Sequence, residues 1–232
     1  MLTLALDTAG AGASLALGDG GRLLAGLQVQ AAAHQQAEGL LPALAALFRL
    51  AGRAPADLAR LAVAIGPGSY TGLRNGLAVA RTLAQLDGIP VFGVDNLTLL
   101  AARAAIGGLV SPCLDIRRGE VYTSLLDTRS PGTPAVVAGA GVRQAEDWVR
   151  QLAARQEPVV LLGELPAAGQ EWLARSDGCL RLVPADRLAP AAATLLRLAD
   201  AADEAAWVGY EQALPLYPDR PVAQVPAAMR RT

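Results

Sequence analysis

Hydrophobic and polar positions alternate with the period of a β-strand at the start of the chain. Residues 2–7 place a leucine at every second position and end on Asp7, a pattern typical of a strand with one apolar face. Gly18-Asp19-Gly20-Gly21 then indicates a tight hairpin turn between strands near Ser14–Leu17 and Arg22–Gln30. The opening segment is therefore predicted to form three antiparallel strands.

A helical period follows these strands. Apolar residues recur at three- and four-residue spacing from Leu40 to Ala51, and Gly52 ends the stripe. Pro42 lies inside the stripe and predicts a kink or a restart of the helix. The next predicted elements are a buried strand at 61–65, a helix at 71–86, a strand at 91–93 and a helix at 96–106. This order predicts an α/β fold in which helices pack on a mixed sheet.

The second half of the chain has a weaker pattern. Gly107-Gly108 predicts a boundary that divides the chain into an N-terminal subdomain, 1–106, and a C-terminal subdomain, 107–232. In the second segment, strands are predicted near 109–114, 121–126 and 159–162, and helices near 145–155 and 191–206. Prolines from Pro215 onward predict an irregular tail.

Composition narrows the function classes. Hydrophobic residues make up 53% and charged residues 18% of 232 residues, so disorder is not expected. The net charge of −1 and the 4% aromatic content provide neither a basic field nor a stacking surface for direct RNA binding. All 20 cationic side chains are arginine, which excludes the lysine of a P-loop or kinase and any Schiff base.

Cysteine content and hydropathy bear on location. Cys113 and Cys179 are isolated and lack the spacing of a metal site. The N-terminus reaches Asp7 too early for a signal peptide, and no apolar run approaches the length of a membrane span. We therefore expect a cytoplasmic protein with reduced thiols and no membrane contact.

The segment GPGSYTGLRNG, Gly66–Gly76, leads from the predicted buried strand into a helix. Glycines and a helix N-terminus can together cradle a phosphate, and Ser69 or Thr71 can cap the helix. A tight turn with a capping serine explains the same residues. Asp7-Thr8, at the end of the first strand, is either a turn cap or the acidic position that actin-like folds place near phosphates and metal. The phosphate hypothesis rests on Asp7, Thr8, Gly66, Gly68, Ser69 and Thr71.

Small residues recur along one face of the predicted helix 71–86. Gly72, Gly76, Ala80 and Ala84 lie at four-residue steps, and each glycine costs roughly 1 kcal/mol relative to alanine in a helix. Such a face allows close approach of another element. That element is either the chain's own sheet or helix, or a helix of a second protein, and the sequence leaves both open.

Two further features could carry chemistry. His34 is the only histidine, so the chain cannot supply a pair of histidine metal ligands, and neither a metal hydrolase nor a Ser-His-Asp triad is favoured. The segment DIRRGEVY, Asp115–Tyr122, predicts a hairpin whose turn carries both signs of charge. This turn is either solvated and self-paired or a site that uses its two arginines.

These segments together resemble one family. LALDTAG and SLALGD, the single histidine ahead of Leu40, GPGSYTGLRNGLAVARTLA, VFGVDNLTLLA, DIRRGEVY and the late ALPLYP occur in the order seen in the TsaB family, also called YeaZ. The resemblance implies an actin-like (ASKHA, RNase H-like) fold of two subdomains with mixed sheets, the second degenerate. It also implies a non-catalytic subunit of the bacterial complex that forms N6-threonylcarbamoyladenosine at position 37 of tRNAs reading ANN codons.

The resemblance implies partners as well as a role. Such a subunit binds the catalytic paralogue TsaD, with the ATPase TsaE in the same assembly and tRNA contacted only through it; in isolation it forms a homodimer. The family interface is a helix bundle whose helices match His34–Leu50 and Thr71–Leu86 here. The implied interface residues are His34, Leu41, Leu44, Phe48, Gly72, Leu73, Gly76 and Ala80. The motif residues Tyr70, Arg74, Asp115, Arg117, Arg118 and Glu120 have no assigned role.

Cofactor expectations follow the same resemblance. No cofactor is expected to bind tightly, and ATP with Mg²⁺ is expected at the interface of the complex. The metal-binding histidines of the catalytic paralogue are absent from the matching segment Asp95–Leu100. The alternative is an ASKHA-type ATP-binding phosphotransferase that uses Asp7 and the turn Gly66–Ser69.

Overall fold

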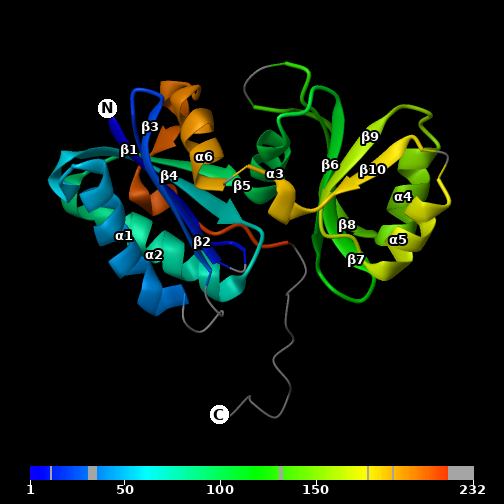
Figure 1. Ribbon diagram of the computed structural model, residues 1–232, viewed down its shortest axis with the longest axis horizontal. Helices are drawn as coiled ribbons and strands as arrows, with labels where there is room; N and C mark the ends of the chain where they lie inside the picture. Colours follow the sequence, from blue (N-terminus) through cyan, green and yellow to red (C-terminus); the bar gives the residue numbers. More distant parts are fainter. Residues whose placement is uncertain (11, 31–35, 131–132, 177, 190, 219–232) are drawn as a thin grey trace, which may run out of the picture.

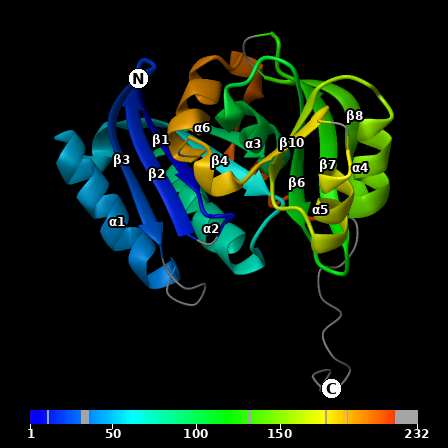
Figure 2. The same ribbon diagram turned by 45° about the vertical axis from the view of Figure 1, so that its right-hand side comes forward.

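The computed structural model describes residues 1–218 except 11, 31–35, 131–132, 177 and 190. His34 lies outside these described residues. Within them the strands form two mixed sheets, which stand side by side with helix α3 between them (Figures 1 and 2). No described helix is both long enough and apolar enough to cross a membrane. The expected α/β fold with two mixed sheets is confirmed.

The first sheet begins with the predicted antiparallel strands. In spatial order its strands are β11 (Trp207–Val208), β5 (Val91–Asp95), β4 (Leu58–Gly66), β1 (Leu2–Asp7), β2 (Gly12–Asp19) and β3 (Arg22–Gln30). β4 and β5 run parallel to β1. Gly20 and Gly21 have φ of +55° and +77°, which suits the two-residue turn between β2 and β3.

Alternating side chains of β1 explain how helices cover both faces of this sheet. Leu4 and Leu6 join one core cluster with α1 (Gln36–Ala51) and α2 (Tyr70–Asp87). Ala5 joins the other cluster with α3 (Asn96–Ala104) and α6 (Ala191–Asp200). The period of two therefore places the large leucines under α1 and α2, and small alanines under α6. Helix α1 continues through Pro42 as one helix, so the predicted restart does not occur.

The second sheet packs its helices on one face and α3 on the other. In spatial order its strands are β10 (Leu180–Val183), β9 (Val159–Gly163), β6 (Leu109–Asp115), β7 (Glu120–Asp127) and β8 (Ala135–Gln144). Helices α4 (Ala145–Ala153) and α5 (Ala167–Ala174) pack on one side. Leu100 and Ala101 of α3 pack on the other. The sequence pattern missed β8, α5 and β10.

The chain returns to the first sheet at its end. α6 packs on β1 and β2, β11 pairs with β5, and residues 213–218 follow. Arg103 of α3 donates hydrogen bonds to the carbonyl oxygens of Ala185 and Ala189, just ahead of α6. The predicted division at 106/107 separates the two sheets along the chain, yet α6 and β11 of the predicted second subdomain pack on the first sheet. The division itself stays a prediction.

Candidate functional site

The turn between β4 and α2 contains the GPGSY segment. β4 ends at Gly66, whose φ of +107° favours glycine, and the Gly66–Pro67 peptide bond is cis. Ser69 is the N-cap of α2, and its Oγ accepts a hydrogen bond from the Gly72 backbone N–H at 3.2 Å. Of the two predicted caps, Ser69 is therefore the N-cap and Thr71 lies inside the helix.

The polar groups of this turn are largely engaged within the chain. The Ser69 N–H donates to the Ala9 carbonyl oxygen at 2.8 Å, and the Asn96 Nδ2 donates to the Pro67 carbonyl oxygen at 2.8 Å. A Cβ on Gly68 would lie 2.6 Å from the Ala9 carbonyl oxygen. The glycines therefore allow the β1–β2 turn to pack on the β4–α2 turn. This arrangement fits the tight-turn interpretation, and the phosphate hypothesis stays a prediction.

Asp7 and Thr8 hold the same junction from the side of β1. The Asp7 Oδ1 accepts a hydrogen bond from the Ala9 N–H at 2.9 Å, the geometry of a turn cap. Burial raises the pKa of the Asp7 carboxyl, and the Ala9 hydrogen bond and the charge of Arg103 oppose that rise. The Thr8 hydroxyl is buried and donates to the Gly72 carbonyl oxygen at 2.8 Å.

Metal ligation receives no support from the described residues, which contain no group of three or more His, Cys, Asp or Glu side chains able to hold an ion. Asp95 instead caps α3, because its Oδ1 accepts a hydrogen bond from the Thr98 N–H at 3.0 Å. Mg²⁺ carried by ATP is usually held by one or two carboxylates, waters and the phosphates themselves, so the expectation of ATP with Mg²⁺ stays a prediction.

The small-residue face of α2 is turned inward, which corrects part of the predicted interface. Gly72, Gly76 and Ala80 are buried, and a Cβ on Gly76 would lie 2.1 Å from the Thr8 Oγ1. Leu44, Phe48 and Leu73 of the predicted interface are also buried inside the chain. Thr8, directly after β1, approaches this face at Gly76, so these side chains pack within the chain itself.

The outward side of α1 and α2 is different in character. The two helices pack side by side on the first sheet (Figure 1). We define the outer helix face by its exposed apolar and small residues, which are Leu41 and Ala45 of α1 and Ala78, Thr82 and Leu86 of α2. Leu41 and Leu86 are 63% and 73% exposed. Of the predicted interface residues, Leu41 belongs to this face.

The DIRRGEVY segment forms the predicted hairpin between β6 and β7. The Asp115 Oδ1 accepts a hydrogen bond from the Arg117 N–H at 2.6 Å, and Arg117 and Arg118 adopt left-handed φ values of 73° and 58°. The Gln144 Nε2 donates to the Glu120 Oε1 at 3.3 Å. Both arginines are exposed. The turn is thus braced by its own Asp115 and by β8.

One contact of the GPGSY segment was not anticipated from the sequence. The Tyr217 ring lies 5.6 Å from the Tyr70 ring, and the Leu216 N–H donates to the Ile65 carbonyl oxygen at 2.7 Å. ALPLYP was recognised as a motif, but no local pattern indicates that it covers a turn some 150 residues earlier.

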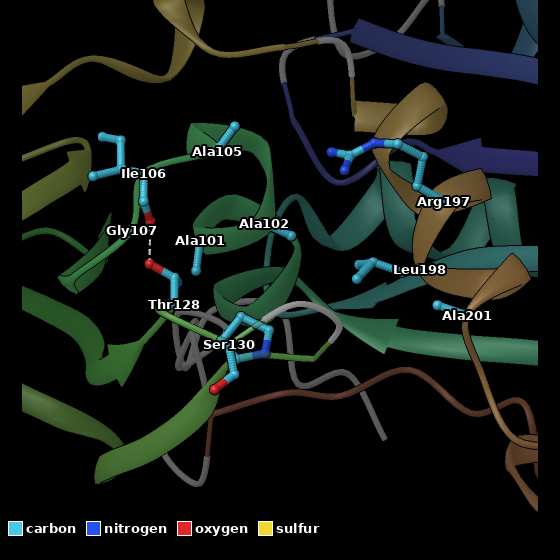
Figure 3. A pocket seen from close by; sticks show the side chains of 11 residues that line it. Ala101, Ala102, Ala105, Ile106, Gly107, Thr128, Ser130, Arg197, Leu198 and Ala201 are labelled. Carbon is cyan, nitrogen blue, oxygen red and sulfur yellow. Dashed lines mark hydrogen bonds between the residues drawn. The ribbon is translucent and has the colours of Figure 1, made fainter.

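A cavity of about 320 Å³ lies elsewhere, where α3 and α6 end (Figure 3). Its lining includes Ala101 of α3, Ala105 directly after α3, Leu198 of α6, and Thr128 directly after β7. The Thr128 hydroxyl donates to the Ile106 carbonyl oxygen (Figure 3). The cavity therefore follows the junction of the two sheets and lies apart from the GPGSY turn.

Comparison with known proteins gives consistent similarities. The family model described as TsaD, tRNA N6-adenosine threonylcarbamoyltransferase, matches residues 26–137. The tRNA threonylcarbamoyladenosine biosynthesis protein TsaB of Bacillus subtilis is 42% identical over 124 residues, which cover 53% of this chain and 54% of that protein. The chain thus spans about half the length of the curated relatives it matches.

Solved structures match over a greater length. YeaZ from Pseudomonas aeruginosa is 29% identical with a TM-score of 0.76, covering 93% of this chain and 99% of that chain. A structure described as an uncharacterized protein with similarity to peptidase YEAZ from Pseudomonas aeruginosa is 30% identical with a TM-score of 0.77, covering 93% and 98%.

Proposed function

The chain belongs to the TsaB/YeaZ family, and from this premise we propose that it is a non-catalytic scaffold subunit in the formation of N6-threonylcarbamoyladenosine in tRNA. In this proposal the chain acts in the cytoplasm and binds a TsaD-type catalytic paralogue. A TsaE-type ATPase and tRNA join through the assembly. The name of the Bacillus subtilis relative supports the pathway.

The observation that carries the docking proposal is the outer helix face. Leu41 and Leu86 leave most of two large apolar side chains in water. Alanines at 45 and 78 and Thr82 are also exposed on the same helices, so little side-chain bulk stands in the way of another helix. Such a surface is typical of a helix-packing interface rather than of a solvated helix pair.

The TsaD family match suggests how a partner would meet this face. It covers residues 26–137, which include α1 and α2. A paralogue related over this region would bring helices of the same kind. The proposed contact is therefore helix against helix, with the small positions of one pair facing the leucines of the other. A second copy of this chain could use the same face, which is our proposal for a homodimer in isolation.

The nucleotide part of the proposal follows from the engaged turn. The Ser69 and Gly72 N–H groups donate inside the chain, so these two donors are not available to a phosphate. We propose that the isolated chain binds ATP with Mg²⁺ weakly or not at all. Any nucleotide held jointly would lie at the interface with the paralogue.

The test measures affinity for the purified catalytic paralogue from the same source by biolayer interferometry. Leu41→Glu and Ala78→Glu place a charge on the outer helix face without entering the core. Val136→Glu is the matched control, because Val136 is 69% exposed on β8 of the second sheet. We expect at least about tenfold weaker binding for the first two variants, since a buried unpaired charge is costly at an interface.

The cellular arm of the test measures threonylcarbamoyladenosine in tRNA after depletion of the chain and rescue by each variant. We expect rescue by Val136→Glu and impaired rescue by Leu41→Glu. An unchanged level of threonylcarbamoyladenosine in tRNA after depletion would contradict the pathway proposal. Equal affinity of all variants for the paralogue would contradict the outer helix face as the docking site.

A further inference from the structure

The C-terminal ALPLYP motif, Ala213–Pro218, has no role in the function proposed above, although the structure places it on the GPGSY turn. After β11, the chain passes through a short 3₁₀ turn at Tyr210–Gln212, which packs against α2. Ala213 is 3% exposed and belongs to the core under α1 and α2. The segment therefore starts from a fixed point in the first core and continues outward over the end of β4.

Backbone contacts fix the next part of the segment. The Leu216 N–H donates to the carbonyl oxygen of Ile65, in the last part of β4, at 2.7 Å. A Cβ on Gly66 would lie 2.6 Å from the Leu216 carbonyl oxygen. Gly66 is thus required for close approach of two backbones as well as for its positive φ. The segment therefore packs with the first sheet, although it follows the second sheet in the sequence.

Aromatic contacts extend this arrangement to the surface. The ring centroids of Tyr70 and Tyr217 are 5.6 Å apart at an interplanar angle of 35°, within the range of favourable ring pairs. Arg74 donates from Nη1 to the Tyr70 hydroxyl at 2.9 Å, and its Cζ lies 5.3 Å from the Tyr70 ring centroid. Tyr70 is thus held by the helix behind it and by the C-terminal segment.

The resulting cluster leaves a large part of its apolar surface in water. Tyr70 is 58% exposed, Leu214 56%, Leu216 38% and Tyr217 37%. We call Tyr70, Arg74, Leu214, Leu216 and Tyr217 the tyrosine cluster. Tyrosine and arginine dominate the strongly contributing residues of protein interfaces, because they combine a large contact area with polar ends.

We infer that the tyrosine cluster is a second part of the surface that receives the catalytic paralogue, and that Tyr217 positions Tyr70 for this contact. The inference rests on the proposed function. Arg74 connects the two surfaces, because it lies on α2, the helix that also carries Ala78, Thr82 and Leu86 of the outer helix face. The cluster would extend that face beyond the N-terminus of α2 onto the C-terminal segment.

Charge indicates the chemistry of the partner surface. Within the described part of the chain, Arg74 forms no ion pair with a carboxylate. Helix α2 also carries Arg81, and its one acidic residue is Asp87 at the opposite end. A partner that covers Arg74 must therefore supply a carboxylate, or leave a buried charge unpaired. The surface that fits is an apolar patch with an aspartate or glutamate beside it.

The experiment measures the affinity of the full chain for the catalytic paralogue. Tyr217→Ala removes the ring contact, and Tyr217→Phe is the matched control that keeps the ring. Arg74→Gln removes the charge, shortens the side chain and keeps a polar end. We expect about tenfold weaker binding for Tyr217→Ala and Arg74→Gln, and near-normal binding for Tyr217→Phe. The melting temperature of Arg74→Gln should stay close to that of the unaltered chain, because Arg74 is exposed, and circular dichroism checks that Tyr217→Ala is folded at the temperature of the binding measurement.

Each result has a defined reading. Normal binding by Tyr217→Ala overturns this inference alone. The outer helix face is tested separately, by the affinity of Leu41→Glu for the paralogue. If Leu41→Glu loses binding and Tyr217→Ala does not, the outer helix face is supported and the role of the tyrosine cluster is contradicted. If the unaltered chain fails to bind the paralogue, both proposals fall. If Tyr217→Ala changes self-association by analytical ultracentrifugation but leaves paralogue affinity unchanged, the occupant is a second copy and the inference is wrong.

Discussion

The contact between Gly76 and Thr8 allows a sharp test of why α2 carries glycines. Gly76 lies inside α2, where Gly→Ala normally stabilises a helix by about 1 kcal/mol. Here the new Cβ would lie 2.1 Å from the Thr8 Oγ1 and 3.1 Å from its Cβ and Cγ2. Thr8 is 3% exposed and has no free space to retreat into solvent. We therefore predict that Gly76→Ala destabilises the fold.

The size of the effect follows from three contributions. Forcing an extra carbon into a packed site costs about 1–3 kcal/mol. Displacing the Thr8 hydroxyl from the Gly72 carbonyl oxygen, now at 2.8 Å, costs about 0.5–1.5 kcal/mol more. The gain in helix propensity offsets about 1 kcal/mol. The expected net loss in the free energy of unfolding is about 2 kcal/mol.

The assay is urea unfolding followed by circular dichroism, with a double-mutant cycle. In the Thr8→Ala background, the hydroxyl and methyl that meet the new Cβ are gone. Gly76→Ala should then cost little or even stabilise, which gives a coupling energy of about 2 kcal/mol between the two positions. Gly39→Ala in α1 is the matched control, because its nearest atom, the Val29 Cγ1, is 3.7 Å away.

Two results would refute the reasoning. If Gly76→Ala stabilises the chain as Gly39→Ala is expected to, the close approach to β1 does not limit position 76. If Gly76→Ala costs the same with and without the Thr8 side chain, some other neighbour sets the requirement for glycine. Either result would reopen the interpretation of this face of α2 as a surface for a second protein.

Three further predictions concern single side chains. Ser69→Ala removes the N-cap of α2 and should lower the free energy of unfolding by about 1 kcal/mol in urea titrations; an unchanged midpoint would contradict the capping role. Asp7→Asn should raise stability at neutral pH, because burial holds the pKa of Asp7 above its unfolded value and disfavours the ionised form. That gain should vanish below about pH 4, where both states are protonated, and a gain that persists there would contradict the assignment. Cys113 is buried and its pKa is raised by burial, so a thiol reagent should label Cys179 alone in the native chain and both cysteines in urea; native labelling of both would show that the second core is open.

Much of the fold could be read from local patterns. The alternation over residues 2–7 predicted β1, the glycines at 20 and 21 predicted the β2–β3 turn, and Ser69 was one of the two predicted caps of α2. These features depend on interactions between residues close in sequence, so the sequence displays them directly. β8 was missed because it lacks such a local pattern: as an edge strand it is largely exposed, and its apolar and polar residues do not alternate cleanly.

The candidate site shows what local patterns cannot decide. The sequence by itself determined that one face of α2 is made of small residues, because their spacing matches the helical period. Only the tertiary structure decided what approaches that face, and the answer is Thr8 of the chain itself. In the same way, the sequence marked ALPLYP as a motif, but only folding brought Tyr217 against Tyr70. A side chain's spacing is fixed by its own helix, whereas its neighbour is fixed by the packing of elements far apart in the chain.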